Sequence, residues 1–323
     1  MAMDDTHVRQ LQSICQTQHA RWTPGSNNMT SLELEEAIRH LGGAVGDDDT
    51  PFEEMEAVGR DLHLHSMALR SAQSRVRGVT PAATAPPVEF DWRSHNGRSY
   101  VTSVKFQGAC GTCTCFSTTA AVESAICIAT QTSPQIIQGV EVPALSEAQM
   151  FYCGAASQDR TCASGWFLPA ALAYLQNTGV APYSYFPYES GDQPCLIQPG
   201  WESVVTKIIG STKLTAPDEI KSWIATRGPV AIMMVAYEDL FTYKEGIYHP
   251  VSTNKLGVHS VCVVGYSDNK EAWLCKNSWS TQWGEDGYFW MAYGVCGMGS
   301  SVHGINGLAL VDGKPLSPRR PVA

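Results

Sequence analysis

Residues 107–117 read QGACGTCTCFS and form the most informative segment of the chain. Within it, Cys113 opens the stretch CTCFSTTAAVESAICIAT, which runs to Thr130 and is apolar on most faces. That pattern predicts a buried helix that begins at Cys113. A cysteine at a helix start gains from the positive end of the helix dipole, and only the thiolate is a useful nucleophile. Cys113 is therefore the predicted nucleophile.

Three further residues could complete a catalytic set around Cys113. Gln107 lies six positions earlier, across glycines that let the chain curl back, so its amide can join the backbone N–H of Cys113 in an oxyanion hole. His259 heads an apolar stretch and can exchange a proton with the thiol. Asn277 can accept the imidazole N–H and fix its tautomer, and Trp279 would shield that hydrogen bond from water.

The rest of the chain shows helix patterns first and strand patterns later. After residue 110, helical patterns occur at Ser146–Cys153, Phe167–Thr178 and Thr215–Thr226. Strand patterns follow at Val230–Val235, Val258–Tyr266, Ala272–Lys276 and Tyr288–Tyr293. Helices precede strands, which predicts an α+β protein with a helical lobe and a sheet lobe.

Several blocks resemble the papain family of cysteine peptidases, in the same order along the chain. The block at Cys113 resembles QGxCGSCWAFS, the block at His259 resembles xHAVxxVGY, and the block at Asn277 resembles KNSWGxxWGExGY. Shorter matches are DWR at residues 91–93, LSEQ at 145–149 and GVCG at 294–297. The resemblance runs from about Val88 to about Ala309, and papain-like enzymes typically place the histidine roughly 130–150 residues after the cysteine.

The resemblance implies an α+β, papain-like two-lobed fold with a helical left lobe, a β-barrel-like right lobe and an N-terminal helical prosegment. It implies Cys113 as nucleophile, His259 as acid and base, Asn277 as the residue that orients it, and Gln107 as oxyanion donor. The implied reaction is hydrolysis of peptide bonds through a thioester acyl-enzyme. It requires no cofactor and no metal. The implied partners are a peptide or protein substrate and the chain's own prosegment as inhibitor.

The resemblance also implies disulfides and a substrate pocket. The disulfides are Cys110–Cys162 and Cys153–Cys195. Gly165 falls where the family's backbone pairs with an extended substrate. The pocket for the residue two before the scissile bond is implied for Trp166, Phe167, Met233, Val258 and Ser301, with Trp279 nearby. These side chains are mostly apolar, so an apolar substrate residue is expected there.

This chain departs from the family pattern at several positions. Thr114 stands where the tryptophan after the nucleophile is usual, and Cys115 follows it. Ala163 and Ser164 replace the asparagine and first glycine of CNGG, and Ser280 replaces the glycine of NSWG. Cys296 lacks its usual late disulfide partner.

The N-terminal region has the features of a prosegment. An amphipathic stretch opens at Thr30–Glu36 with a capping-box-like start and ends near Gly42-Gly43. Pro51–Arg75 is a second predicted helix. Residues 22–27, WTPGSN, resemble the WxAGxN of short, cathepsin B-type prosegments. We therefore expect a prosegment and linker at residues 1–85, a peptidase domain at 86–315 and a tail at 316–323, with processing in the proline-rich linker at 79–90.

Composition limits the partners and leaves the compartment open. The 323 residues carry a net charge of −9, which argues against nucleic acid or an anionic membrane as a partner. No apolar run approaches the roughly 20 residues of a membrane helix, and no signal peptide is visible at the start. Eleven cysteines favour an oxidising compartment. A lysosomal, vacuolar or secreted protein and a cytoplasmic one both remain open.

Other interpretations stay open beside the peptidase. A papain-like acyltransferase or amide synthase would use the same thioester, and a non-catalytic binding protein could share the fold. Cys110, Cys113 and Cys115 could form a metal cluster, but no zinc-like pair follows them. The remaining apolar-flanked cysteines are interpreted as inert core thiols. No insertion resembles the histidine-bearing loop of cathepsin B-type exopeptidases, so endopeptidase activity is expected.

Overall fold

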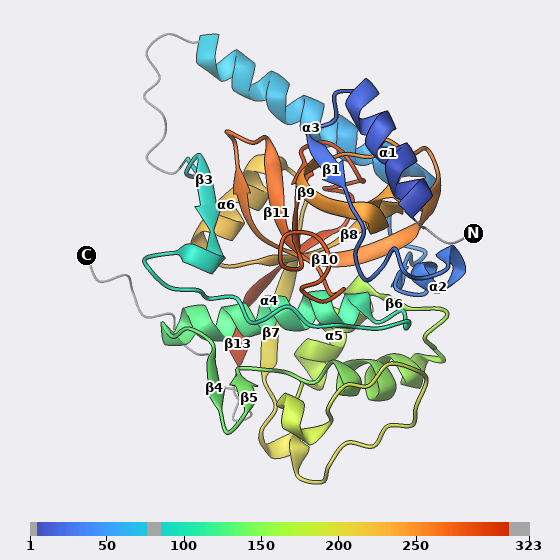
Figure 1. The fold of residues 1–323 in the computed structure, drawn as a ribbon. Coiled ribbons are helices and arrows are strands. Elements are labelled where there is room, and N and C mark those ends of the chain that lie inside the picture. The colour runs from blue at the N-terminus through green and yellow to red at the C-terminus, as the bar shows by residue number, and fades with distance from the viewer. Residues whose placement is uncertain (1–4, 76–84, 310–323) are drawn as a thin grey trace.

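The computed structural model describes residues 5–75 and 85–309 of the chain (Figure 1). Its α-helices are α1 (Asp5–Thr17), α2 (Leu34–Ile38), α3 (Phe52–Arg75), α4 (Cys113–Thr130), α5 (Leu168–Asn177) and α6 (Pro217–Thr226). Its strands are β1 (Trp22–Pro24), β2 (Gly43–Ala44), β3 (Glu89–Asp91), β4 (Gln135–Ile137), β5 (Val140–Val142), β6 (Trp166–Phe167), β7 (Lys207–Leu214), β8 (Val230–Tyr237), β9 (Tyr243–Tyr248), β10 (Lys255–Ser267), β11 (Ala272–Lys276), β12 (Tyr288–Ala292) and β13 (Val302–Ala309). A π-helical segment spans Gln149–Ala155.

One large sheet organises the described residues, and β10 is its central strand. The strand order is β1-β9-β12-β11-β10-β8-β13-β7, with β2, β3 and β6 attached at the sides. The 13-residue β10 pairs antiparallel with β8 on one side and β11 on the other. Its remaining partners are β2 near its start and β3 near its end. Residues far apart in sequence are thereby brought to one strand.

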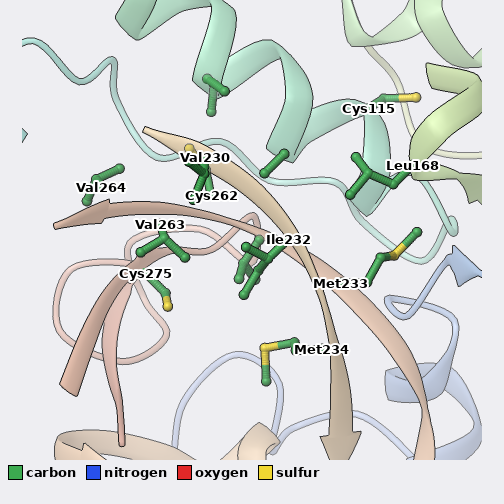
Figure 2. Packing of buried hydrophobic residues seen from close by; sticks show 14 of the residues in the cluster. Cys115, Leu168, Val230, Ile232, Met233, Met234, Cys262, Val263, Val264 and Cys275 are labelled. Carbon is green, nitrogen blue, oxygen red and sulfur yellow. The ribbon is translucent and has the colours of Figure 1, made fainter. Parts of the chain in front are cut away.

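Helix α4 runs between the sheet and the smaller helical part that contains α5 (Figure 1). Within the described chain it is the helix long and apolar enough to cross a membrane, but 72% of that segment is buried inside the protein. It is therefore the core helix that the sequence predicts. Figure 2 shows part of the core beside it, with buried side chains of β8, β10 and β11 and, on the helix side, Cys115 and Leu168.

The predicted helices and strands after residue 110 are largely present. Helix α4 has the predicted bounds, as does β11, and α5, α6, β8, β10 and β12 agree within a few residues. Ser146 accepts a hydrogen bond from the N–H of Gln149 (3.0 Å), as the capping pattern predicts. The pair β7 and β13 is absent from the sequence prediction. Strand β7 contains one glycine and β13 contains two, and the strands meet with register shifts, so neither shows a clean alternation.

The predicted helix from Thr30 towards Gly42 is wrong in most of its length. Only the five-residue α2 forms, and its N-cap residue Glu33 makes no side-chain cap bond. The hydroxyl of Thr30 bonds instead to the carbonyl of Asn27 (2.9 Å), so it belongs to the preceding turn. Gly42-Gly43 do not cap a helix; Gly43 joins the sheet as part of β2. The second predicted helix is present as α3.

The N-terminal region is attached to the sheet lobe at several points. Strand β1 pairs antiparallel with β9. The indole N–H of Trp22 donates to the carbonyl of His249 (2.9 Å), and the amide of Asn28 donates to the carbonyl of Trp279 (2.9 Å). Helix α3 packs its Gly59 directly against the backbone of Gly297. These contacts place residues 5–75 over the sheet lobe.

Candidate active site

Cys113 is the first residue of α4 and is fully buried. Its Sγ accepts a hydrogen bond from the backbone N–H of Ser260 (3.4 Å), the residue after His259. Burial raises the pKa of the Cys113 thiol to about 11, although hydrogen bonds from Ser260 and Gly42 favour the thiolate. In this state Cys113 is a neutral thiol near pH 7.

His259 and Asn277 meet because β10 and β11 are antiparallel neighbours, with Cys262 paired to Lys276. The Nε2 of His259 lies 2.7 Å from Oδ1 of Asn277. That same Oδ1 accepts the backbone N–H of Ser278 (2.8 Å), which identifies it as the amide oxygen. Nε2 therefore donates, and a neutral imidazole then has its lone pair on Nδ1. Asn277 fixes the tautomer that a proton acceptor needs.

The imidazole of His259 is buried in an aromatic setting. The ring of Trp279 stacks on it, with centroids 4.7 Å apart and an interplanar angle of 29°. Burial lowers the pKa of His259 to about 4, while the hydrogen bond to Asn277 acts in the opposite direction. Nδ1 has no hydrogen-bond partner among the described residues. Thiol and imidazole are thus both neutral, and Sγ and Nδ1 are not hydrogen-bonded to each other.

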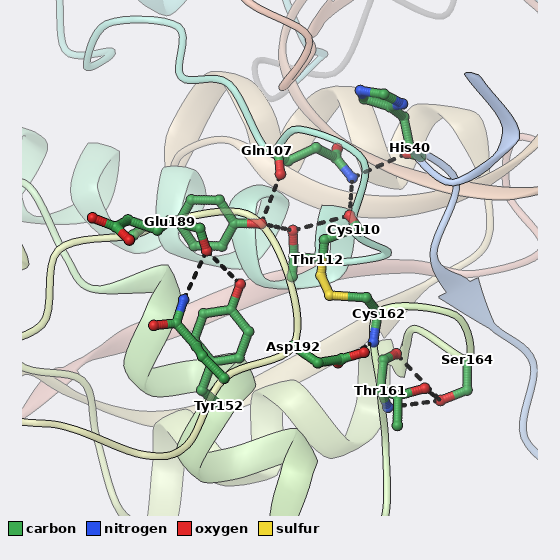
Figure 3. Close-up of a disulfide and its surroundings, with 12 residues drawn as sticks. His40, Gln107, Cys110, Thr112, Tyr152, Thr161, Cys162, Ser164, Glu189 and Asp192 are labelled. Carbon is green, nitrogen blue, oxygen red and sulfur yellow. Dashed lines mark hydrogen bonds between the residues drawn. A yellow bond between two sulfur atoms is a disulfide. The ribbon is translucent and has the colours of Figure 1, made fainter. Parts of the chain in front are cut away.

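Gln107 is held rigidly beside Cys113. Its side-chain oxygen accepts from the hydroxyl of Ser278 (2.6 Å), so the amide nitrogen points the other way. That nitrogen donates to the carbonyl of Cys110 (2.9 Å) and to the carbonyl of His40 (3.0 Å), as Figure 3 shows. The donor that would stabilise an oxyanion is thus used by a carbonyl of the N-terminal region.

The N-terminal chain passes directly over the nucleophile at Gly42-Gly43. Gly43 pairs with Val258 on β10 and with Trp166 on β6, and the carbonyl of Gly42 accepts the N–H of Trp166 (3.0 Å). A Cβ on Gly42 would lie 2.2 Å from the backbone of Gly111, and one on Gly165 would lie 1.9 Å from the Gly42 carbonyl oxygen. Glycine at these positions lets three backbones stack without side chains.

The residues expected to form the substrate pocket surround this same segment. A Cβ on Gly43 would lie 2.6 Å from Val258 and 2.8 Å from the sulfur of Met233. Trp166 is buried, and Phe167 carries the guanidinium of Arg160 over its ring (4.5 Å). The carbonyl of Ser301 accepts the N–H of Met233 (3.0 Å). The wall facing Gly43 is therefore apolar.

Two hydrogen bonds to the backbone at Gly165 and Trp166, at the start of β6, are absent from the sequence prediction. The side chain of Arg160 donates to the carbonyl of Gly165 (2.8 Å). The hydroxyl of Thr114 donates to the carbonyl of Trp166 (3.1 Å), so this departure from the family pattern supports the strand that holds the N-terminal chain. Arg160 lies outside the motifs quoted from the sequence, and Thr114 lies in the segment 107–117, where its residue type gives no sign of this contact.

A buried charged cluster lies behind the site and is also absent from the sequence prediction. Nζ of Lys105 lies 2.7 Å from Glu123 and 2.6 Å from Glu147. Thr102 donates to Glu123 (2.5 Å) and accepts from Lys276 (3.0 Å), which precedes Asn277. Burial alone would lower the pKa of Lys105, but the charges of the two glutamates raise it above its ordinary value. The cluster joins α4 to β11.

The cysteines divide into two bonded pairs and seven buried free thiols. The disulfides are Cys110–Cys162 and Cys153–Cys195, the pairs that the family resemblance implies. Because Cys110 is in a disulfide (Figure 3), it cannot join Cys113 and Cys115 in a metal cluster. Burial raises the pKa of Cys115 well above its ordinary value, as expected for an inert core thiol. Cys296 is free and buried.

Comparison with known proteins agrees with this arrangement. The family model of papain family cysteine proteases matches residues 86–305. Bovine pro-cathepsin H is 33% identical over 232 residues, which cover 69% of this chain and just under two thirds (64%) of that protein. Maize cysteine proteinase 2 is 34% identical over 261 residues, 77% of this chain and 67% of that protein. The chain belongs to the papain family of cysteine proteases.

Solved precursor structures share the fold across the N-terminal region as well. Procathepsin L2 of Tenebrio molitor superposes with a TM-score of 0.69 at 28% identity, covering 93% of this chain and 89% of its own. Procathepsin B S9 of Trypanosoma congolense gives 0.69 at 21% identity, covering 98% and 99%. Both matches include far more than residues 86–305, so the fold is that of a papain-family precursor.

Proposed function

We propose that this chain is the zymogen of a cysteine endopeptidase that uses Cys113, His259 and Asn277. The observation that carries the proposal is the 2.7 Å hydrogen bond between Asn277 and His259. The residue after His259, Ser260, contacts the sulfur of Cys113. In the active form, Nδ1 of His259 takes the proton of Cys113. The thiolate attacks the scissile carbonyl, and the imidazolium then protonates the leaving amine. Water hydrolyses the resulting thioester.

Gln107 and the backbone N–H of Cys113 are the proposed oxyanion donors. The amide of Gln107 is oriented by Ser278, so it requires little reorganisation when charge develops on the substrate oxygen. The apolar wall of Trp166, Phe167, Met233 and Val258, with Ser301 behind it, is the proposed pocket for an apolar substrate residue. Gly165 is the proposed backbone partner of the substrate.

The proposed prosegment, residues 1–85, inhibits by occupying these groups. Its His40 carbonyl takes the Gln107 donor, and its Gly42-Gly43 backbone covers the thiol. Burial of Cys113 and His259 also favours the neutral pair over thiolate and imidazolium. Cleavage before the proposed domain, residues 86–315, would release all three constraints. The proposed tail, 316–323, lies outside the described residues.

The test is labelling with a thiol-directed epoxide followed by peptide mapping, before and after acid treatment. We expect slow labelling of the intact chain at pH 7, fast labelling of Cys113 after processing, and peptide hydrolysis that the label abolishes. Cys113→Ala should lose both label and hydrolysis, whereas Cys115→Ala, the matched control thiol on the same helix, should keep both. Hydrolysis that persists in Cys113→Ala would overturn the proposal. Mass spectrometry of products formed with an added amine would reveal acyl transfer in place of hydrolysis.

A further inference from the structure

A second contact between α4 and β10, the elements that carry Cys113 and His259, lies next to the proposed catalytic pair. Ser117 lies on α4 one helical turn after Cys113, and Ser260 follows His259 on β10. Their hydroxyl oxygens are 2.6 Å apart, and both side chains are buried (3% and 1% exposed). The pair therefore links the same two elements as Cys113 and His259, α4 and β10.

The two hydroxyls have more acceptors than protons. Ser260 Oγ lies 2.8 Å from the carbonyl of Ile232, and Ser117 Oγ lies 3.1 Å from the carbonyl of Thr114. Each hydroxyl carries one proton. Either Ser117 donates to Ser260 and Ser260 to Ile232, or Ser260 donates to Ser117 and Ser117 to Thr114. Both arrangements satisfy both donors and keep the hydrogen bond between the serines. If each hydroxyl donated only to its own carbonyl, two oxygen lone pairs would face each other at 2.6 Å, which is repulsive, so the short contact favours the two bonded arrangements.

Ser260 touches α4 in two places at once. Its backbone N–H donates to the sulfur of Cys113, and its side chain meets Ser117. A small cavity of about 10 Å³ lies beside the pair, and its lining includes Ser117, Ser260 and Asn277. A shift of β10 along α4 would therefore break two hydrogen bonds in a tightly packed region.

We infer that Ser117 and Ser260 form a hydrogen-bonded latch that holds the strand of His259 against the first turn of α4, and so positions the imidazole for proton transfer with Cys113. The inference rests on the proposed function. Ser117 and Ser260 are positioning residues that touch no substrate. Proton transfer between Cys113 and His259 requires placement to within a fraction of an ångström. These two residues are 146 positions apart in the chain. The latch supplies a link that the catalytic pair itself lacks in the precursor.

The experiment compares Ser117→Ala, Ser260→Ala and the double variant, each made as the full chain and then processed. Either single change leaves the other hydroxyl a backbone acceptor, Thr114 or Ile232, so no buried donor is orphaned. The matched control is Ser124→Ala, because Ser124 is a buried serine on the same helix whose hydroxyl has no partner among the described residues. Ser260→Ala also restores the alanine of the family pattern HAV.

Two readouts separate positioning from a structural role. The first is the pH dependence of Cys113 alkylation by iodoacetamide, which reports thiolate formation. The second is kcat and KM on one peptide substrate. We expect both single variants to shift the alkylation midpoint to higher pH and to lower kcat roughly three- to tenfold with little change in KM. The double variant should lose no more than either single variant, since each change opens the same latch. Ser124→Ala should match the parent.

Two results would overturn the latch. One is an unchanged alkylation profile with kcat within about twofold of the parent in all three variants; the other is additive losses in the double variant. If a variant fails to fold, thermal unfolding reports it and the remaining single variant still decides. A parent chain whose processed form has no reactive Cys113 at neutral pH would instead contradict the proposed function, and the two failures are thereby distinguished.

Discussion

The side-chain amide of Gln107 donates a 3.0 Å hydrogen bond to the carbonyl oxygen of His40, 67 residues earlier in the chain. A backbone carbonyl of the N-terminal region therefore sits where the proposed reaction would develop negative charge. The same region covers the thiol with Gly42 and pairs Gly43 with both walls of the site. In the precursor the proposed catalytic residues are thus already assembled, and the N-terminal region occupies the site between them.

Replacing Gly42 by valine should release the nucleophile in the unprocessed chain. The new Cβ would lie 2.2 Å from the Gly111 backbone, which cannot yield as a flexible side chain would, so the segment must leave its position. We expect Cys113 in the intact Gly42→Val chain to react with the epoxide roughly tenfold faster or more. Gly46→Ala is the control, because its Cβ would meet only side-chain atoms that can shift, Asp49 Oδ2 at 3.3 Å and the Phe167 ring at 3.6 Å. Equal labelling of the variant and the parent would contradict the inhibitory role of this segment.

Asn277 should control the alkaline limb of the pH–rate profile. Its oxygen accepts the Nε2 proton of His259, an interaction that raises the pKa of the imidazole. Asn277→Ala should therefore lower that pKa, move the alkaline limb of kcat/KM to lower pH and reduce kcat by at least about tenfold. Asn277→Asp places a negative charge there and should move the same limb to higher pH. Parallel shifts in the two variants would be incompatible with this role.

Docking of the N-terminal region should weaken as the pH falls. Burial lowers the pKa of His40 from 6.5, and it lowers the pKa of His259 to about 4. The undocked state then binds more protons than the docked state between about pH 6.5 and pH 4, so stability of docking is lost through that window. Epoxide labelling of the intact chain should be roughly tenfold faster at pH 4.5 than at pH 7. His40→Gln should flatten this dependence, and His65→Gln, an exposed histidine on α3, should leave it unchanged.

Lys105 should be important for stability rather than for reaction chemistry. It pairs with both Glu123 and Glu147, so Lys105→Met leaves two buried carboxylates without their cation. Removing one partner of such a cluster costs about 3 kcal/mol of the free energy of unfolding. Urea denaturation followed by tryptophan fluorescence measures it. The exposed Lys244→Met should change the free energy of unfolding by less than about 0.5 kcal/mol. If Lys105→Met also lowered the free energy of unfolding by less than about 0.5 kcal/mol, Glu123 and Glu147 would already be neutral in the parent.

Local patterns in the sequence were sufficient for much of the fold and for the candidate catalytic residues. The apolar run from Cys113 predicts α4, and apolar stretches predict β10 and β11, because helix and strand periodicity is written in neighbouring residues. The family resemblance then identifies Gln107, His259 and Asn277 as partners of Cys113. None of these steps requires knowledge of which distant segments touch.

The tertiary structure decided every feature that depends on contacts between residues far apart in the sequence. Thr30 reads as a helix cap but bonds back to Asn27, and Gly42-Gly43 read as a helix stop but enter the sheet over Cys113. The Ser117–Ser260 contact joins residues 143 positions apart, and neither serine shows its partner in the sequence. Periodicity and caps are local, whereas a hydrogen bond across two walls depends on where the whole backbone brings those walls together. The sequence by itself thus determined which residue is the proposed nucleophile, and the folded chain determined that it is covered and how its neighbours are held.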